Sequence, residues 1–244
     1  MENQIQKNIN NSLALDFDND EGIWIKRGKT LRMLIGILGV SLPILLLLIT
    51  FIFFGLNSPL ESISHYYFTR ASTIFTTILS LIAIFLIVYS GKEPIDFYIS
   101  TLAGITAMIV VFFPTGNLVE VCCDPTKSYA VTNFPESSIR ETIHLISAGI
   151  FIASLAFMSY FIFTKSNKPA VSRGKAKVIR NRIYRVCGFF IVIALAIIFL
   201  GFIEVIPEND YNNYNLTFWM ETLAIESFGF SWLVKGGAFF KDRN

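Results

Sequence analysis

Residues 33–60 read MLIGILGVSLPILLLLITFIFFGLNSPL and contain no charged side chain. A helix needs about 20 apolar residues to cross a lipid bilayer, and the apolar part of this stretch is longer than that. Residues 71–91, ASTIFTTILSLIAIFLIVYSG, form a second uncharged stretch. Two such stretches in succession predict membrane-spanning helices, and Pro43 predicts a bend within the first of them.

The composition of the whole chain also indicates a membrane protein. Its 244 residues are 53% hydrophobic and 16% charged, with a mean hydropathy of +0.57, which is too apolar for an ordinary soluble domain. Cys122 and Cys123 are adjacent and Cys187 lies in an apolar run, so we expect a labile thiol pair and apolar packing rather than a disulfide framework. The two histidines are far apart and no zinc-ligand spacing is present. We therefore expect neither a metal nor a cofactor.

Charged and turn-forming residues divide the chain into six predicted helices of a single all-α membrane bundle over residues 31–238. The predicted helices cover residues 31–54, 71–90, 97–113, 142–164, 184–203 and 217–234. Residues 1–30 are predicted to be a polar tail with an interfacial anchor, residues 165–183 a basic linker, and residues 239–244 a second tail. Within the fourth helix, Gly149 and Ala153 have the spacing at which small residues let membrane helices approach closely.

The distribution of lysine and arginine predicts the orientation of the bundle. Of the 20 basic residues, all but Arg70, Lys127 and Arg140 lie on the side of the two termini. Cytoplasmic loops carry the excess of basic residues in membrane proteins. We therefore predict a protein of the cell membrane with both termini in the cytoplasm. A basic linker of this kind fits either a topology signal or a site for anionic lipid headgroups or nucleic acid. It carries almost no interleaved aromatic residues, so we expect a topology signal and no nucleic-acid partner.

Between the first two predicted helices lies the polar stretch 60–70, LESISHYYFTR, which this orientation puts at the outer membrane surface. The direction of the later helices brings His144 and Glu221 to the same level, with Glu226 about 7.5 Å deeper. A carboxylate inside a membrane helix needs a partner or water, so we expect Glu226 to face the interior and to pair with Arg70, His144 or a tyrosine. The predicted ligand-binding residues are Ser62, Ser64, Tyr66, Tyr67, Arg70, His144, Glu221 and Glu226.

Three kinds of function fit this outer polar layer. The first is a non-enzymatic protein that binds membrane lipids, with a second copy of the chain or another protein as further partners. The second is a membrane-embedded lipid hydrolase or transferase, for which Ser62, Ser64, His144 and Glu226 supply the residue types of a nucleophile, a base and an orienting acid. The third is a small-molecule transporter, which the apolar inner halves of the first three helices disfavour.

Four short motifs also resemble a known group of proteins. They are Ser62–Tyr67 (SISHYY), Leu102–Gly104 (LAG), His144–Ala148 (HLISA) and the segment Glu221–Lys235. In this order they resemble a family of uncharacterised bacterial six-helix membrane proteins and, more distantly, the damage-regulated autophagy modulator superfamily. The resemblance implies six helices, an outer polar layer, and a role in membrane modulation or lipid remodelling. It implies no catalytic residue set.

Overall fold

The computed structural model describes residues 20–89, 91, 93–118, 129–166 and 174–240, with side chains from residue 28 onward. All regular structure in these ranges is helical, apart from one isolated antiparallel bridge between Thr69 and Ala130. The predicted all-α class is therefore confirmed for this part of the chain. Cys122 and Cys123 lie outside the described residues.

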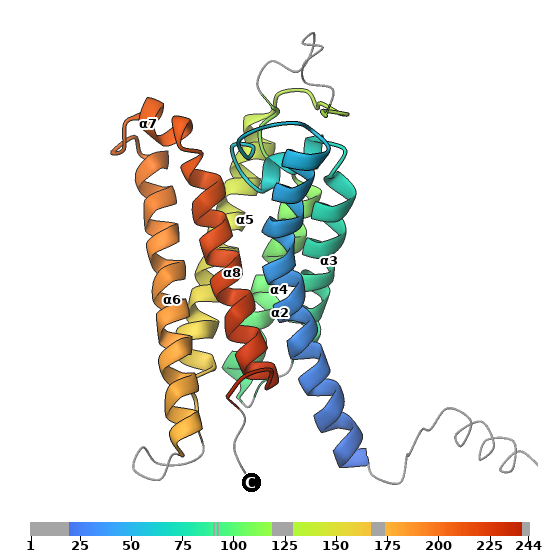
Figure 1. Ribbon diagram of the computed structural model, residues 1–244, viewed down its shortest axis with the longest axis vertical. Helices are drawn as coiled ribbons and strands as arrows, with labels where there is room; N and C mark the ends of the chain where they lie inside the picture. Colours follow the sequence, from blue (N-terminus) through green and yellow to red (C-terminus); the bar gives the residue numbers. More distant parts are fainter. Residues whose placement is uncertain (1–19, 90, 92, 119–128, 167–173, 241–244) are drawn as a thin grey trace, which may run out of the picture.

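Seven α-helices and two other helical turns follow one another along the described ranges (Figure 1). The long helices are α2 (Asp20–Ile52), α3 (Ser72–Val88), α4 (Pro94–Phe112), α5 (Ser138–Phe157), α6 (Lys175–Phe202) and α8 (Leu216–Gly236). A 3₁₀ turn, η1 (Ser64–Phe68), precedes α3, and a π-helical turn, η3 (Met158–Ile162), continues α5. The short helix α7 (Glu208–Asn213) joins α6 to α8.

The long helices pack in chain order, and α8 closes the arrangement by packing against both α6 and α2. Glycine residues allow the backbones of α2 and α8 to approach each other closely. A Cβ atom added to Gly36 would lie 2.7 Å from the Leu233 side chain, and one added to Gly229 would lie 2.8 Å from the Val40 backbone nitrogen. Small residues of this kind let membrane helices approach closely. The sequence suggested such a contact at Gly149 and Ala153 as well, but within the described chain a Cβ added to Gly149 meets nothing within 4 Å and Ala153 is exposed, so no helix of this chain packs closely there.

Four helical segments are long and apolar enough to cross a membrane: Gly28–Ile52, Pro94–Phe112, Ser138–Ile162 and Lys175–Phe202. Helix α3 is equally apolar but has only 17 residues. Helix α8 has 21 residues and carries Glu221, Glu226 and Lys235. The structure thus supports a helical membrane protein, while the six-span count and the orientation of the termini stay predictions.

Several helix ends differ from those that the sequence predicted. The predicted basic linker ends early, because α6 begins at Lys175. Lysine and arginine are good helix formers, so charge alone did not mark a loop. Helix α5 begins at Ser138, where the Ser137 side chain accepts a hydrogen bond from the Arg140 backbone N–H. Helix α2 continues through Pro43 as one helix to Ile52.

The two ends of the bundle differ in what they expose. The η1 turn, α7 and the first residues of α5 lie at the upper end in Figure 1, which we call the η1 end. The first residues of α2 and the last of α8 lie at the lower end, which we call the Lys165 end after a residue three positions beyond the end of η3. Each end holds a cavity, and the larger set of chemically reactive side chains gathers at the η1 end.

Candidate functional site

A cavity of about 230 Å³ opens at the η1 end, and we call it the η1 pocket. Its rim is polar and its wall is apolar, because the rim comes mostly from turns and helix ends whereas the wall comes from one face of α5 and the last turns of α6. The rim consists of Glu61, Ser62, His65, Thr115, His144, Tyr211, Asn212, Asn215, Thr217 and Glu221. The wall consists of Leu145, Ala148, Gly149, Ile152, Leu195 and Ile198, with Leu216 above it.

The turn that carries Ser62 and His65 is held by the start of α8. A carboxylate oxygen of Glu221 accepts a 2.7 Å hydrogen bond from the Ile63 backbone N–H. In return, the Phe218 backbone N–H donates to the Glu61 carbonyl oxygen over 3.0 Å. These bonds satisfy backbone groups that neither element could satisfy alone. The position of the turn over the pocket therefore depends on Glu221.

Ser62 and His65 are in direct contact inside this turn. The Ser62 hydroxyl lies 2.7 Å from His65 Nδ1, and His65 Nε2 lies 3.4 Å from a carboxylate oxygen of Glu61. A carboxylate only accepts hydrogen bonds, so the proton of the neutral ring belongs on Nε2 and the Ser62 hydroxyl donates to Nδ1. Burial lowers the pKa of His65 to about 4, and the exposed Glu61 carboxylate does not offset this. The imidazole is therefore a neutral base at pH 7.

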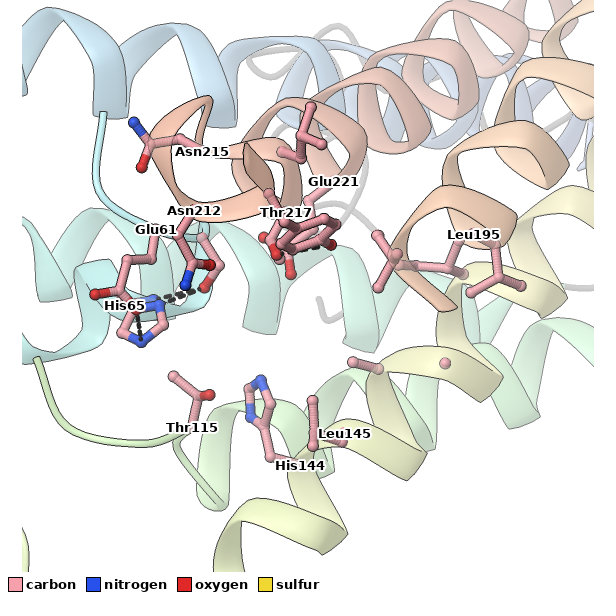
Figure 2. A pocket seen from close by; sticks show the side chains of 17 residues that line it. Glu61, His65, Thr115, His144, Leu145, Leu195, Asn212, Asn215, Thr217 and Glu221 are labelled. Atoms are coloured by element: carbon pink, nitrogen blue, oxygen red, sulfur yellow. Dashed lines mark hydrogen bonds and ion pairs between the residues drawn. The ribbon is translucent and has the colours of Figure 1, made fainter. Parts of the chain in front are cut away.

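His144 faces the pocket from α5, on the other side of it. Its Nδ1 donates a 2.8 Å hydrogen bond to the Phe113 carbonyl oxygen at the end of α4. This bond fixes the tautomer, since a carbonyl oxygen cannot donate. Nε2 of the neutral ring is then left as an acceptor. Figure 2 shows His65 and His144 on opposite sides of the same space, with Thr115 between their elements.

Helix α7 closes the pocket from above. The Thr217 hydroxyl donates to the Tyr211 hydroxyl over 3.0 Å, which ties α7 to the first turn of α8. Burial raises the pKa of Tyr211, the hydrogen bond from Thr217 opposes this rise, and the nearby Glu221 adds to it. Asn212 and Asn215 complete this side of the pocket (Figure 2). Their amides supply both donors and acceptors.

The structure brings together only some of the residues that the sequence predicted as a site. Ser62, His144 and Glu221 line the η1 pocket. The other predicted residues of this stretch do not line the pocket. Ser64 is buried beside it, and Tyr66 is buried and hydrogen-bonds through its hydroxyl to Thr50. Tyr67 packs against Phe68 and Phe134, and Arg70 is exposed.

Glu226 requires a correction. It is half-buried on α8, outside the lining of the η1 pocket, and no hydrogen bond or ion pair joins it to Arg70, His144 or a tyrosine in the described residues. The prediction that it pairs with one of them was wrong. A step of five residues turns a helix by about 140°, and this rotation takes Glu226 away from the pocket that Glu221 lines.

The sequence missed the contribution of residues 211–217. Tyr211, Asn212 and Asn215 lie between the predicted helices 184–203 and 217–234, in a segment whose sequence suggests an acidic, Asn-rich turn, and Thr217 is the first residue of the second of these helices. A helix signal was present, because Pro207 followed by Glu208 and Asp210 is typical of a helix N-terminus. That α7 then folds over the pocket depends on tertiary contacts that one sequence does not reveal.

In the part of the chain that the structure describes, no group of three or more His, Cys, Asp or Glu side chains could hold a metal ion. The pocket offers instead two carboxylates, two imidazoles, hydroxyls and amides beside an apolar wall. No lysine or arginine of the described residues lines it. This arrangement suits a ligand with an apolar part and a polar part rich in hydrogen-bond donors.

Comparisons with protein-family models, with curated proteins and with solved structures gave no match. The functional argument therefore depends on the residues and geometry of this chain.

Proposed function

We propose that the protein crosses the cell membrane six times with both termini in the cytoplasm, and that its η1 pocket binds the headgroup of a lipid in the outer leaflet. The two shorter or more polar helices, α3 and α8, complete the six spans. Their packing against the four longer helices supports this count.

The observation that carries the proposal is the division of the pocket into a polar rim and an apolar wall. Leu145 on that wall is 48% exposed, so the wall continues to the surface that faces the lipid chains in a membrane. An acyl chain can lie along α5 while the headgroup enters the rim. A soluble polar metabolite would leave this apolar wall without a partner.

The charges of the rim limit which lipid headgroups the pocket can bind. Glu61 and Glu221 are both acceptors when ionised, and His144 offers Nε2 as a further acceptor. With no cation of the described residues in the lining, a headgroup that donates hydrogen bonds fits best. An ethanolamine ammonium has N–H donors and a choline group has none. We therefore expect phosphatidylethanolamine to bind in preference to phosphatidylcholine.

Native mass spectrometry of the purified protein in detergent tests this preference directly. Phosphatidylethanolamine should be retained more strongly than phosphatidylcholine by the wild-type chain. The Leu145→Trp variant, whose larger side chain projects at the mouth of the pocket, should lose that difference. Glu226→Gln is the matched control, because it alters a carboxylate outside the pocket and should retain the difference. Equal retention of both lipids by the wild-type protein would exclude the proposed headgroup class.

A second candidate function is hydrolysis of an ester in the bound lipid, which the 2.7 Å contact between Ser62 and His65 favours. The Ser62 oxygen would attack the ester carbonyl carbon while its proton moves to His65 Nδ1. That proton would then pass to the departing alcohol, and water would later release the acyl group from Ser62. Neutral His65 is in the correct state for the first step.

Labelling by a fluorophosphonate probe distinguishes hydrolysis from binding alone. Ser62→Ala should abolish labelling if Ser62 is the nucleophile. Ser64→Ala is the matched control, because Ser64 is buried in the same turn and does not line the pocket. Absence of labelling in the wild-type protein, or labelling that persists in Ser62→Ala, would reject hydrolysis and leave lipid binding as the function.

A further inference from the structure

An open groove of about 600 Å³ lies along α6, in the half of this helix that begins at the Lys165 end (Figure 1). Its lining residues on α6 follow one another at steps of three or four, so they form one stripe on the helix. The other side of the groove comes from η3, the π-helical turn that continues α5. We call it the α6 groove. Asn181, Arg182, Arg185, Val186 and Phe189 line it from α6, and Tyr160 lines it from η3.

Arg182 and Arg185 give this groove a positive charge. Both side chains are exposed, and neither forms an ion pair within the described residues. No carboxylate of the described chain lines the groove. Positions three apart on a helix are neighbours, so the two guanidinium groups repel each other. An anion between them would offset this repulsion and accept hydrogen bonds from both.

Asn181 adds a hydrogen-bonding group that the protein leaves unused. The residue is 8% exposed, and its Oδ1 is buried with no donor in the part of the chain that the structure describes. Buried polar atoms almost always have a partner, so this amide points to a missing one. The oxygen and nitrogen of an amide change places when the group turns by half a rotation. A hydroxyl both donates and accepts, so it can pair with either orientation.

Tyr160 forms the aromatic side of the groove. A Cβ atom added to Gly188 would lie 2.8 Å from Tyr160 Cβ, so the glycine lets α6 lie directly against η3. Tyrosine is enriched where a membrane meets water, and its hydroxyl is a further hydrogen-bond donor. π-helical turns are rare and occur frequently at functional sites. The groove therefore combines charge, an amide and an aromatic ring at one place.

The depth of the arginines indicates which kind of molecule carries the anion. The helical residues 186–202 follow Arg185, carry no charge and extend about 26 Å at 1.5 Å per residue. The hydrocarbon core of a bilayer is about 30 Å thick. If α6 spans it, Arg182 and Arg185 lie at the level of the lipid phosphates. Phe189, which is 58% exposed, then lies one turn deeper among the acyl chains.

We propose that the α6 groove binds an anionic phospholipid with a hydroxyl in its headgroup, which phosphatidylglycerol represents. The phosphate lies between Arg182 and Arg185, the hydroxyl pairs with Asn181, and an acyl chain follows Val186 and Phe189 into the membrane. A soluble phosphate compound would leave this apolar part of the groove uncovered. The site requires α6 to span the bilayer, but it does not depend on lipid binding in the η1 pocket.

Native mass spectrometry of the purified protein, titrated with single lipids, separates the parts of this site. Phosphatidylglycerol has the negative charge and hydroxyls, phosphatidylmethanol has the charge alone, and phosphatidylcholine has neither a net charge nor a hydroxyl. The wild-type protein should bind them in this order, the first most tightly. Arg182→Gln and Arg185→Gln should each weaken phosphatidylglycerol binding about fivefold. Asn181→Leu should bind phosphatidylglycerol and phosphatidylmethanol equally.

Lys175→Gln is the matched control, because Lys175 is exposed on α6 two turns before Arg182 and does not line the groove. It should bind all three lipids as the wild type does. Arg182→Lys keeps the charge and should retain most of the binding. The preference of the η1 pocket for phosphatidylethanolamine should persist in Arg182→Gln, so the two sites succeed or fail separately.

Three results would overturn the proposal. Equal weakening by Lys175→Gln would show a diffuse basic surface in place of a site. Equal binding of phosphatidylglycerol and either other lipid by the wild-type protein would remove the role of the charge or of the hydroxyl. Displacement of phosphatidylglycerol by inorganic phosphate, at an ionic strength where chloride does not displace it, would indicate a soluble ligand.

Discussion

His65 couples the stability of the η1 turn to pH. The unfolded chain binds a proton at this residue near pH 6.5, whereas in the folded protein burial lowers the pKa to about 4. Between these values the unfolded state binds more protons, so the free energy of unfolding falls as the pH falls. The contribution is fully present above pH 6.5, and about 3 kcal/mol of it is lost by pH 4.

We expect the melting temperature of the wild-type protein to fall between pH 6.5 and pH 4 more steeply than that of His65→Gln. Glutamine occupies a similar volume and does not titrate, so it removes the His65 contribution. Thermal unfolding in one detergent over this pH range measures the difference between the two curves. His144 and the carboxylates around the pocket titrate in both proteins, so the difference isolates His65 together with its electrostatic coupling to these neighbours. Parallel curves would show that His65 does not carry the effect.

At the scale of the elements, the α2–α8 contact depends on glycine. The closest atoms to a Cβ at Gly229 are the Val40 backbone nitrogen at 2.8 Å and the Gly36 carbonyl oxygen at 2.9 Å. Backbone atoms cannot rotate away as a side chain can. Gly229→Ala should therefore force the two helices apart and destabilise the bundle by about 1–3 kcal/mol, the usual cost of overpacking.

Gly149→Ala is the control for this prediction, since a Cβ there meets nothing within 4 Å. It should leave the melting temperature close to that of the wild type. Thermal unfolding of both variants in the same detergent gives the comparison. Equal destabilisation by the two substitutions would mean that the close helix contact at Gly229 does not determine the result, since helix propensity favours alanine at both positions.

These elements also show what can be predicted from one sequence. Uncharged stretches such as residues 33–54 indicate helices because the membrane requires continuous apolar length. Ser62, His144 and Glu221 were predicted to share a site because helix direction alone places them at one level. The lateral position of Glu226 and the fold of α7 could not be predicted, because they depend on helix rotation and on packing between distant segments. The same reason hides the Gly36–Gly229 contact, whose members lie in different helices.

The whole molecule has two polar ends of opposite chemistry. Acceptors from Glu61, Glu221 and His144 gather in the η1 pocket, whereas Arg32, Lys165 and Lys235 line a cavity at the Lys165 end. If the η1 end faces outward, the Lys165 end faces the cytoplasm. The proposed headgroup site therefore depends on an assumption about orientation, which can be tested separately from the ligand.

Cysteine accessibility tests that orientation. In a background with the three native cysteines replaced by serine, Asn213→Cys places an exposed thiol on α7 at the η1 end. Lys175→Cys places one at the exposed start of α6. In intact cells, a membrane-impermeant maleimide should label Asn213→Cys at once and Lys175→Cys only after permeabilisation. The reverse pattern would place the η1 pocket in the cytoplasmic leaflet, because the two thiols lie at opposite ends of a bundle whose helices span the bilayer.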